Sequence, residues 1–362
     1  MAAVEKKHKI GYIGFGSMVS HYHYDTAMRE DIAFAPAAVF DIDPDARALA
    51  ESRGLKAFDN LRDFLDSKLF DFVLVGTSNQ FHCEYACAAL EAGYDTMCEK
   101  PVAMTSDEIR KMIATSKKTG KLFTVHHNRR WDKDFLVLKK ALADYDIGKL
   151  FRVENRVGGK DGSGQMGGWR GFEDHGGGML LDWGVHMLDQ TLFLIEEPVK
   201  SVDAQIITIR GGEIDDYSKI LIRFESGLVA QVESSTFNPI PFPKWLVVGD
   251  KGAITVPEIC SGTGAMARVI GKSHWDETAV APYYTHDKVE TRSQPKYIVD
   301  EWVEAPIDAN GIPQDWAFLY KNLAGVLDGT EKLVVTPESV LRCFEVIEAA
   351  FRSAKEGHSI EF

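Results

Sequence analysis

The chain has 362 residues, of which 45% are hydrophobic and 26% are charged, and its formal net charge is -13. This length and this composition predict a globular protein of two domains with sizeable cores. The acidic charge argues against nucleic acid and against an anionic membrane surface as partners, because both attract basic faces.

The sequence predicts neither a membrane segment nor a disulfide framework. No apolar run approaches the roughly 20 residues that span a bilayer, and residues 1–9 lack the apolar core of a signal peptide. The five cysteines are odd in number and form no CxxC pair, which indicates free thiols in a reducing compartment. We therefore expect a cytoplasmic protein.

The first element is an apolar run from Lys9 to Phe15, which is typical of a buried strand. It runs into the turn Gly14-Phe15-Gly16-Ser17-Met18. Two glycines let the backbone approach a pyrophosphate closely, and the next helix would add amide donors at its N-terminus. Val19 replaces the third glycine of this dinucleotide-binding pattern, so we expect that helix to lie farther from the strand. The alternative is a plain strand, turn and helix without a ligand.

A second strand, Ala37 to Phe40, ends at Asp41, which lies 22 residues after Val19. A carboxylate near this offset binds the hydroxyls of the adenosine ribose in dinucleotide-binding folds. Because the same carboxylate would repel the extra phosphate of NADP, we expect NAD as the cofactor. Asp43 is the second candidate for this role, and a simple turn at Asp41 is the structural alternative.

A third apolar run, Phe70–Gly76, ends in a polar loop over residues 77–82. Loops at the carboxyl ends of parallel strands lie beside the ligand in open α/β folds. From this loop we expect three contacts to the cofactor: Thr77, Asn79 and His82. The structural alternative is an N-cap, because the loop opens the helix that continues to Ala92.

The next strand, Tyr94–Cys98, leads into Glu99-Lys100-Pro101. A lysine at this strand end can point its ammonium at a bound substrate, and we expect Glu99 and Lys100 to reach the cofactor as well. A surface turn stopped by proline is the structural alternative. A helix over Thr105–Lys118 and a strand over Leu122–His126 follow.

These repeats predict a doubly wound parallel sheet of the Rossmann type over residues 1–126 and a second domain over residues 127–362. The second domain is predicted as α+β with a large open, mainly antiparallel sheet. Its predicted strands are Leu150–Val157, Ser201–Ile209, Ser218–Phe224, Gly227–Ser234, Trp245–Val248 and Ala253–Val256. Its predicted helices are Asp134–Ala143, Gln314–Leu327 and Pro337–Lys355, with one more before Glu197. Residues 260–305 show no interpretable pattern.

A glycine-rich stretch, residues 158–178, carries ten glycines in 21 residues. Because it is flanked by a strand and an apolar helix, we interpret it as a mobile loop over a site rather than as a linker. The helix that follows places Asp182 and His186 four residues apart on one face, with Asp189 near the same stripe. A carboxylate beside a histidine orients the ring of a general base; a structural pair and two metal ligands are the alternatives.

Three motifs in this order resemble the Gfo/Idh/MocA oxidoreductase family: the Gly14/Gly16 loop, Glu99-Lys100-Pro101, and Gly176-Gly177-Gly178 followed by Asp182 and His186. Further matching stretches are Ala88–Gly93, Asn128-Arg129-Arg130 and the helix that opens with Thr336-Pro337-Glu338. The resemblance covers nearly the whole chain. It implies a cofactor domain followed by an α+β domain, with Lys100, Asp182 and His186 as catalytic residues at the nicotinamide cleft. We expect no metal, because the spacing places no third ligand beside Asp182 and His186.

The resemblance implies NAD-dependent oxidation of a ring secondary alcohol in a sugar, glycoside or cyclitol, with oxidation at C3 of a glycoside as one form. In this reading His186 is the base, Asp182 orients it, and Lys100 stabilises the developing alkoxide. Further substrate contacts are expected from Asn128, Arg129, Lys160, Trp169, Arg170 and His175. The alternatives are a glycosidase that uses the same hydride chemistry and a non-catalytic NAD-binding sensor. We also expect a homo-oligomer formed through the open sheet.

Overall fold

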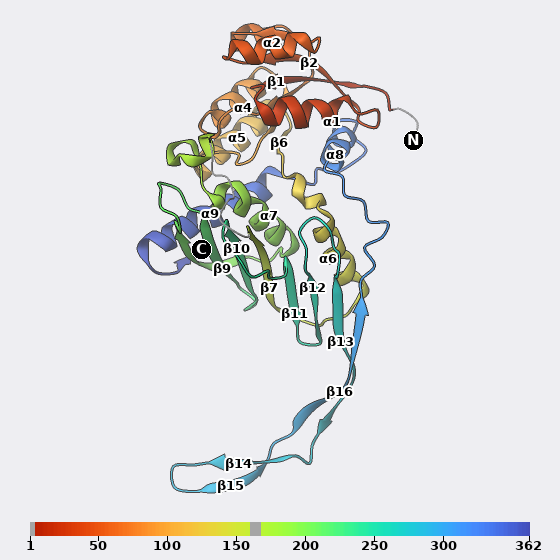
Figure 1. Ribbon diagram of the computed structural model, residues 1–362, viewed down its shortest axis with the longest axis vertical. Coiled ribbons are helices and arrows are strands. Elements are labelled where there is room, and N and C mark those ends of the chain that lie inside the picture. The colour runs from red at the N-terminus through yellow and green to blue at the C-terminus, as the bar shows by residue number, and fades with distance from the viewer. Residues whose placement is uncertain (1–3, 160–167) are drawn as a thin grey trace.

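The computed structural model describes residues 4–159 and 168–362, whose strands form two large sheets (Figure 1). The first sheet has six strands in the order β3-β2-β1-β4-β5-β6, and every neighbouring pair is parallel. The strands are β1 (His8–Ile13), β2 (Phe34–Phe40), β3 (Lys56–Phe58), β4 (Phe72–Val75), β5 (Asp95–Cys98) and β6 (Phe123–Val125). This order confirms the predicted doubly wound sheet, although the short edge strand β3 was not predicted.

Helices follow the strands of this sheet, and several begin at the polar side chains that cap them. The helices are α1 (Tyr24–Met28), α2 (Pro44–Ser52), α3 (Leu61–Asp66), α4 (His82–Glu91) and α5 (Ser106–Thr119). Asp43 caps α2 by accepting from the amide of Asp45, and Thr105 forms a capping box with Glu108 at α5. The starts of α2 and α5 are therefore set largely by local sequence.

Val19 lies in a π-helical segment, Met18–His23, directly after the glycine loop. A Cβ atom added at Gly76 would lie only 2.3 Å from Cγ2 of Val19. Gly76 therefore makes room for the side chain that replaces the third fingerprint glycine. The helix can therefore approach the sheet closely, because the glycine needed for close packing lies at the end of the neighbouring strand. The larger distance between helix and strand that Val19 led us to expect is not required.

The second sheet has nine strands in the order β16-β13-β12-β11-β7-β10-β9-β8-β17. Only β7 and β10 pair in parallel, which confirms a large, mainly antiparallel sheet. Its strands in the body are β7 (Leu150–Gly158), β8 (Val199–Ile207), β9 (Tyr217–Phe224), β10 (Val229–Ser235), β11 (Trp245–Gly249), β12 (Gly252–Val256) and β17 (Ile360–Glu361). Helices α6 (Lys133–Asp144), α7 (Val185–Leu194) and α9 (Pro337–Glu356) pack against this sheet, gathered on one of its faces (Figure 1).

The chain returns to the first sheet near its end. Helix α8 (Phe318–Leu327) lies near the first sheet in Figure 1, and its Tyr320 ring contacts the ring of Phe34 in β2 at a centroid distance of 5.6 Å. The predicted start of this helix at Gln314 is wrong, because the side chains of Asp315 and Trp316 are used in contacts before the helix begins. The first sheet therefore carries a C-terminal helix that its own β-α repeats do not predict.

Residues 260–305, which had no interpretable pattern, begin in the body, where β13 pairs with β12, and then form an arm that extends away from it (Figure 1). Its strands are β13 (Met266–Asp276), β14 (Val280–Tyr284), β15 (Val289–Ser293) and β16 (Lys296–Pro306). Trp275 and Tyr297 pair across β13 and β16, and their exposed fractions are 60% and 48%. Because both faces of the arm are largely exposed, the burial alternation that marks a strand in sequence is missing.

None of the described helices is long and apolar enough to cross a membrane. All five cysteines carry free thiols, as predicted from their number and spacing.

Candidate active site

A cleft of about 920 Å³ lies where the loops that follow β1, β2, β4, β5 and β6 meet residues of the second half of the chain. The carboxyl ends of parallel strands are the usual ligand-binding edge of such a sheet. The first half contributes Gly14, Gly16, Ser17, Met18, Asp41, Thr77, Asn79, His82, Glu99, Lys100 and His126 to its wall. The wall continues with Asn128, Arg129, Arg170, Asp182, Trp183, His186 and Trp316.

At one end of the cleft the carboxylate of Asp41 is held against the glycine loop. Its Oδ2 accepts from the backbone N–H of Phe15 at 2.6 Å, and its Oδ1 accepts from the backbone N–H of Asp43 at 2.9 Å. Phe15 itself is 1% exposed, so it contributes its backbone here while its ring packs in the core. A Cβ added at Gly16 would meet nothing within 4 Å, which leaves room beside that backbone for a ligand.

The loop after β4 joins the two halves of the protein. Asn79 Nδ2 donates to the carbonyls of His175, at 3.0 Å, and of Gly176, at 3.3 Å. The buried ring of His82 lies between the carbonyls of Pro101 and Thr77, at 2.9 and 3.0 Å. Asn79 and His82 both line the cleft, and their hydrogen bonds also hold the surrounding loops in place.

Lys100 reaches across the cleft to the second half of the chain. Its Nζ donates to Oδ1 and to the backbone carbonyl of Asp182, both at 2.9 Å. Arg170 Nε donates to the same Oδ1 at 3.1 Å. Burial alone would raise the pKa of Asp182, but the charges of Lys100 and then Arg170 hold that pKa below its usual value. Asp182 is therefore an ionised carboxylate between two cations. The peptide bond between Lys100 and Pro101 is cis.

His186 lies in α7 and is 6% exposed. Asp182 was expected to orient the ring of His186, and the described contacts contradict this. The Asp182 carboxylate instead bonds Lys100 and Arg170, and Nδ1 of His186 has no hydrogen-bond partner among the described residues. Burial first, and then the charges of Lys100 and Arg129, lower the pKa of His186 well below its ordinary value. The ring is consequently neutral, which is the state that can accept a proton.

Arg129 is held between two indole rings on the wall of the cleft. Its guanidinium carbon lies 4.4 Å from the ring centroid of Trp183 and 5.2 Å from that of Trp316. The carboxylate of Asp132 accepts from Arg129 Nη1 at 3.1 Å and from Trp316 Nε1 at 2.6 Å. Sequence reasoning selected Arg129 and missed both tryptophans. Trp183 could have been found from the sequence, because it directly follows the candidate residue Asp182. Trp316 lies far away in the sequence and reaches the cleft wall only through the fold.

The remaining predicted substrate residues fall in three groups. Asn128 and Arg170 line the cleft. His175 hydrogen-bonds the adjacent Asp174 at 2.6 Å and is not part of the described wall. Lys160 and the side chain of Trp169 lie outside the described parts of the chain.

Glu99 was expected beside the cofactor, and although it borders the cleft it is 6% exposed and bound to two histidines. Its Oε1 lies 2.5 Å from His23 Nε2 and 2.7 Å from His126 Nδ1. These three atoms could face one cation. However, ligand atoms that each lie about 2.0–2.2 Å from one zinc ion are farther apart than hydrogen-bonding distance allows, so shared protons explain this geometry.

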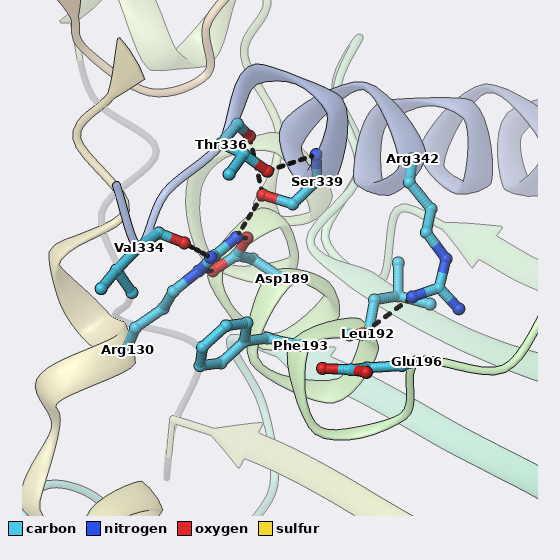
Figure 2. A pocket seen from close by; sticks show the side chains of 9 residues that line it. All are labelled: Arg130, Asp189, Leu192, Phe193, Glu196, Val334, Thr336, Ser339 and Arg342. Atoms are coloured by element: carbon cyan, nitrogen blue, oxygen red, sulfur yellow. Dashed lines mark hydrogen bonds and ion pairs between the residues drawn. The ribbon is translucent and has the colours of Figure 1, made fainter. Parts of the chain in front are cut away.

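A second, smaller cavity of about 230 Å³ lies behind α7 (Figure 2). Arg130 donates from Nε and Nη2 to the carboxylate of Asp189, at 2.8 and 2.6 Å. Figure 2 shows that its guanidinium also reaches the carbonyl of Val334 and the hydroxyl of Ser339, at 2.7 and 2.9 Å. Asp189 therefore belongs to a buried ion pair that ties α7 to the C-terminal segment.

Two regions of the chain match models of one family: residues 8–127 match "Oxidoreductase family, NAD-binding Rossmann fold", and residues 135–255 match "GFO/IDH/MocA C-terminal domain". A scyllo-inositol 2-dehydrogenase (NADP(+)) of Bacillus subtilis is 26% identical over 365 residues, covering 97% of this chain and 95% of that protein. D-glucoside 3-dehydrogenase of Escherichia coli is 32% identical over 195 residues, covering 52% of this chain and 56% of that protein.

Among solved structures, an NAD-binding protein from Listeria innocua is 36% identical, with a TM-score of 0.79 over 98% of this chain and 97% of that one. This likeness extends over both sheets, and the family matches cover the cofactor loop and the helix that carries His186. The chain therefore belongs to the Gfo/Idh/MocA family of NAD(P)-dependent oxidoreductases, whose named relatives here are dehydrogenases of cyclitols and sugars.

Proposed function

We propose that this protein oxidises a ring secondary alcohol of a sugar, glycoside or cyclitol to a ketone with NAD. The observation that carries the proposal is the contact of Lys100 Nζ with Asp182, because it joins a cofactor domain (residues 1–126) and a substrate domain (residues 127–362) at the cleft. His186 lines the same cleft. An ammonium, a carboxylate and a neutral imidazole are thus available where one hydroxyl group must lose both a hydride and a proton.

Each of the three side chains has a role that its environment supports. Lys100 donates to the substrate oxygen and stabilises negative charge as it develops there. His186 accepts the hydroxyl proton, and its lowered pKa keeps it unprotonated beforehand. Asp182 is ionised because of its two cationic partners, and its carboxylate accepts a hydrogen bond from a neighbouring hydroxyl of the substrate ring. When bound, the nicotinamide supplies the hydride acceptor.

The cofactor is proposed to lie along Gly14–Met18, with the adenosine ribose at Asp41. The Asp41 carboxylate faces the glycine loop through its bond to the Phe15 amide, and a carboxylate there disfavours the 2′-phosphate of NADP. The named Bacillus relative uses NADP, so this residue is where the two proteins are expected to differ in cofactor contacts.

The substrate is proposed to be an uncharged polyol. Of the cleft cations, Lys100 and Arg170 contact Asp182, and Arg129 contacts Asp132, so each has a carboxylate partner within the protein. Carboxylates and indole rings suit the hydroxyls and the apolar face of a sugar ring. The similarity to D-glucoside 3-dehydrogenase supports oxidation at C3 of a glycoside as the specific reaction.

The test is incubation of the purified protein and NAD with a panel of hexoses, β-glucosides, α-glucosides and inositols. NADH absorbance and product mass are followed together. A product two mass units lighter than its substrate, formed with NADH, is expected. Free sugar released from a glycoside without net NADH would indicate the glycosidase reaction, and NAD binding with no product from the whole panel would favour a sensor.

We further propose a cytoplasmic homo-oligomer. The nine-stranded sheet gathers its helices on one face, and the arm exposes Trp275 and Tyr297, so one chain leaves apolar surface for another copy to cover. Light scattering after size-exclusion chromatography should give a multiple of the chain mass. Trp275→Ser combined with Tyr297→Ser should weaken the assembly; a monomeric wild-type protein at micromolar concentration would reject it.

A further inference from the structure

The glycine-rich stretch ends in a short segment, residues 170–178, which is called the strap below. It contains the 3₁₀ turn Glu173–His175 and leads directly into the helical segment that carries Asp182 and His186. The sequence pattern singled out Gly176-Gly177-Gly178 at its end, and the reaction proposed above gives these glycines no part. The contacts of the strap show what they are needed for.

The strap is closed on itself by its backbone. The N–H of Gly177 donates to the carbonyl of Phe172 at 2.9 Å, and the N–H of Gly178 donates to the carbonyl of Arg170 at 3.2 Å. A Cβ atom added at Gly177 would lie only 2.3 Å from the carbonyl oxygen of Arg170, closer than real Cβ atoms approach. Glycine at this position therefore lets the chain fold back onto Arg170, so the two ends of the strap hold each other.

Asn79 fastens the strap to the first half of the chain. This residue lies in the loop after β4 and is 2% exposed, and its Nδ2 donates to the carbonyls of His175 and Gly176, at 3.0 and 3.3 Å. Both partners are carbonyl oxygens, which only accept, so the NH₂ group of the amide must face the strap. Gly176 has a φ of 71°, and a Cβ added there would lie 2.9 Å from Asn79 Nδ2. The amide thus packs against a backbone that a larger residue would push away.

The side chain of Arg170 carries the strap to Asp182. Arg170 Nε donates to Oδ1 of Asp182 at 3.1 Å, and the same oxygen accepts from Lys100 Nζ at 2.9 Å. No described residue donates a hydrogen bond to Oδ2 of Asp182, whose side chain is 16% exposed and lines the cleft. The two cations therefore engage one carboxylate oxygen and leave the other as an acceptor for a ligand.

Two donors fix a carboxylate that one donor leaves free to turn. The terminal torsion of an aspartate side chain is broad and roughly two-fold, so a single ammonium can be met by either oxygen. Lys100 comes directly from the end of β5, whereas Arg170 depends on the strap for its place. The orientation of Asp182 consequently depends on whatever holds the strap, which is Asn79.

We propose that Asn79 is a positioning residue of the reaction. By holding the strap it fixes Arg170, and Arg170 together with Lys100 orients Asp182 so that Oδ2 accepts from the ring hydroxyl beside the reacting one. The proposal rests on the proposed function for the part played by Asp182. Substrate recognition by the second half of the chain thus depends on a loop of the first half.

The first test needs no substrate. Hydrogen exchange followed by mass spectrometry compares the wild type with Asn79→Ala and with the isosteric Asn79→Asp, whose carboxylate cannot donate. The peptide covering residues 170–179 should exchange about tenfold faster in both variants, because two hydrogen bonds to the strap are lost. Unchanged exchange in Asn79→Ala would overturn the proposal.

Asn322→Ala is the matched control. Asn322 is also a buried asparagine, and its Nδ2 donates to Glu331 Oε2 and to the carbonyl of Lys332, both at 2.8 Å, but it is not part of the cleft wall. Its variant should leave the exchange of the strap and the turnover unchanged. A strap opened equally by Asn322→Ala would show general loosening and would overturn the role of Asn79.

The second test is a double-mutant cycle at saturating NAD with a polyol that the panel shows to be oxidised. Asn79→Ala and Arg170→Met should each lower kcat/KM by about tenfold, the effect of losing one hydrogen bond to a charged group. The double variant should be no worse than Arg170→Met, because Asn79 acts through Arg170. Losses that multiply in the double variant would refute this path.

The third test asks the substrate which contact is lost. The wild type should oxidise the polyol faster than the single-deoxy analogue that lacks the hydroxyl bound by Asp182, and this preference should shrink about tenfold in Asn79→Ala. An undiminished preference for the polyol over every single-deoxy analogue would sever Asn79 from Asp182. If no polyol is oxidised at all, the proposed function fails, while the exchange result still decides whether Asn79 holds the strap.

Discussion

The two ends of the cleft are built in different ways. The end proposed to hold the cofactor, called the cofactor end below, uses loops that each follow a strand of one parallel sheet, and its clearest contact joins Asp41 to the backbone of Phe15. The reacting end uses side chains that arrive from separate segments, such as Lys100, Asp182 and Trp316. A site made of strand-end loops is encoded locally, whereas a site made of crossing side chains depends on how the two sheets come together.

The largest effect is expected from Lys100→Met, which removes the ammonium that joins the two ends. Loss of one donor to a developing oxyanion lowers kcat by about a hundredfold to a thousandfold. NAD affinity, measured by titration, should stay near the wild-type value because the cofactor end is intact. Lys117→Met, on an exposed face of α5, is the matched control and should turn over normally. Turnover retained in Lys100→Met would remove this residue from the mechanism.

The buried ion pair behind the reacting end should matter for stability. Arg130→Met leaves the Asp189 carboxylate buried without its partner, and breaking such a pair costs about 3–5 kcal/mol of unfolding free energy. Urea unfolding followed by fluorescence measures the loss. The double variant with Asp189→Leu should recover part of it. A single variant as stable as the wild type would show that the pair does not tie α7 to the C-terminal segment.

The cofactor end is tested by Asp41→Ala. Loss of a charge-assisted hydrogen bond is expected to raise the Kd for NAD by about tenfold and to improve relative binding of NADP. Asp43→Asn is the comparison, because Asp43 caps α2 through the amide of Asp45 and should affect stability more than selectivity. If Asp43→Asn shifts the NAD/NADP ratio more than Asp41→Ala does, the ribose contact belongs to Asp43.

The smallest effect concerns Asp215, which supports the segment leading to His186 by accepting from the Leu180 amide at 2.8 Å. Burial raises its pKa to about 6, above the unfolded value. The charged form is therefore disfavoured in the folded state, and stability increases as the pH falls from about 6 towards 4. Asp215→Asn should be more stable than wild type at pH 8, where the buried carboxylate of the wild type is charged, and equal to it near pH 4. Thermal unfolding at both pH values decides; equal stability at pH 8 would contradict the raised pKa.

Much of the architecture could be predicted because it follows local rules. Apolar runs, capping residues and glycines located most strands of both sheets, and the helix from Pro337 begins where Thr336 caps it. The arm was missed because its strands are exposed and lack alternating burial. The start of α8 was misplaced because Asp315 and Trp316 make distant contacts that outweigh local helix propensity.

The sequence by itself determined the glycine loop, the acid after the second strand, and the Glu99-Lys100-Pro101 turn at a strand end, since these depend on chain offsets within one sheet. Only the tertiary structure decided which groups meet across the cleft. In that structure Asp182 bonds Lys100 and Arg170 and not His186. Trp316 packs against Arg129, and Glu99 lies between His23 and His126. The physical reason is that a buried charge takes its partner from whatever the packing brings within hydrogen-bonding distance, and packing joins residues that no spacing in the chain relates.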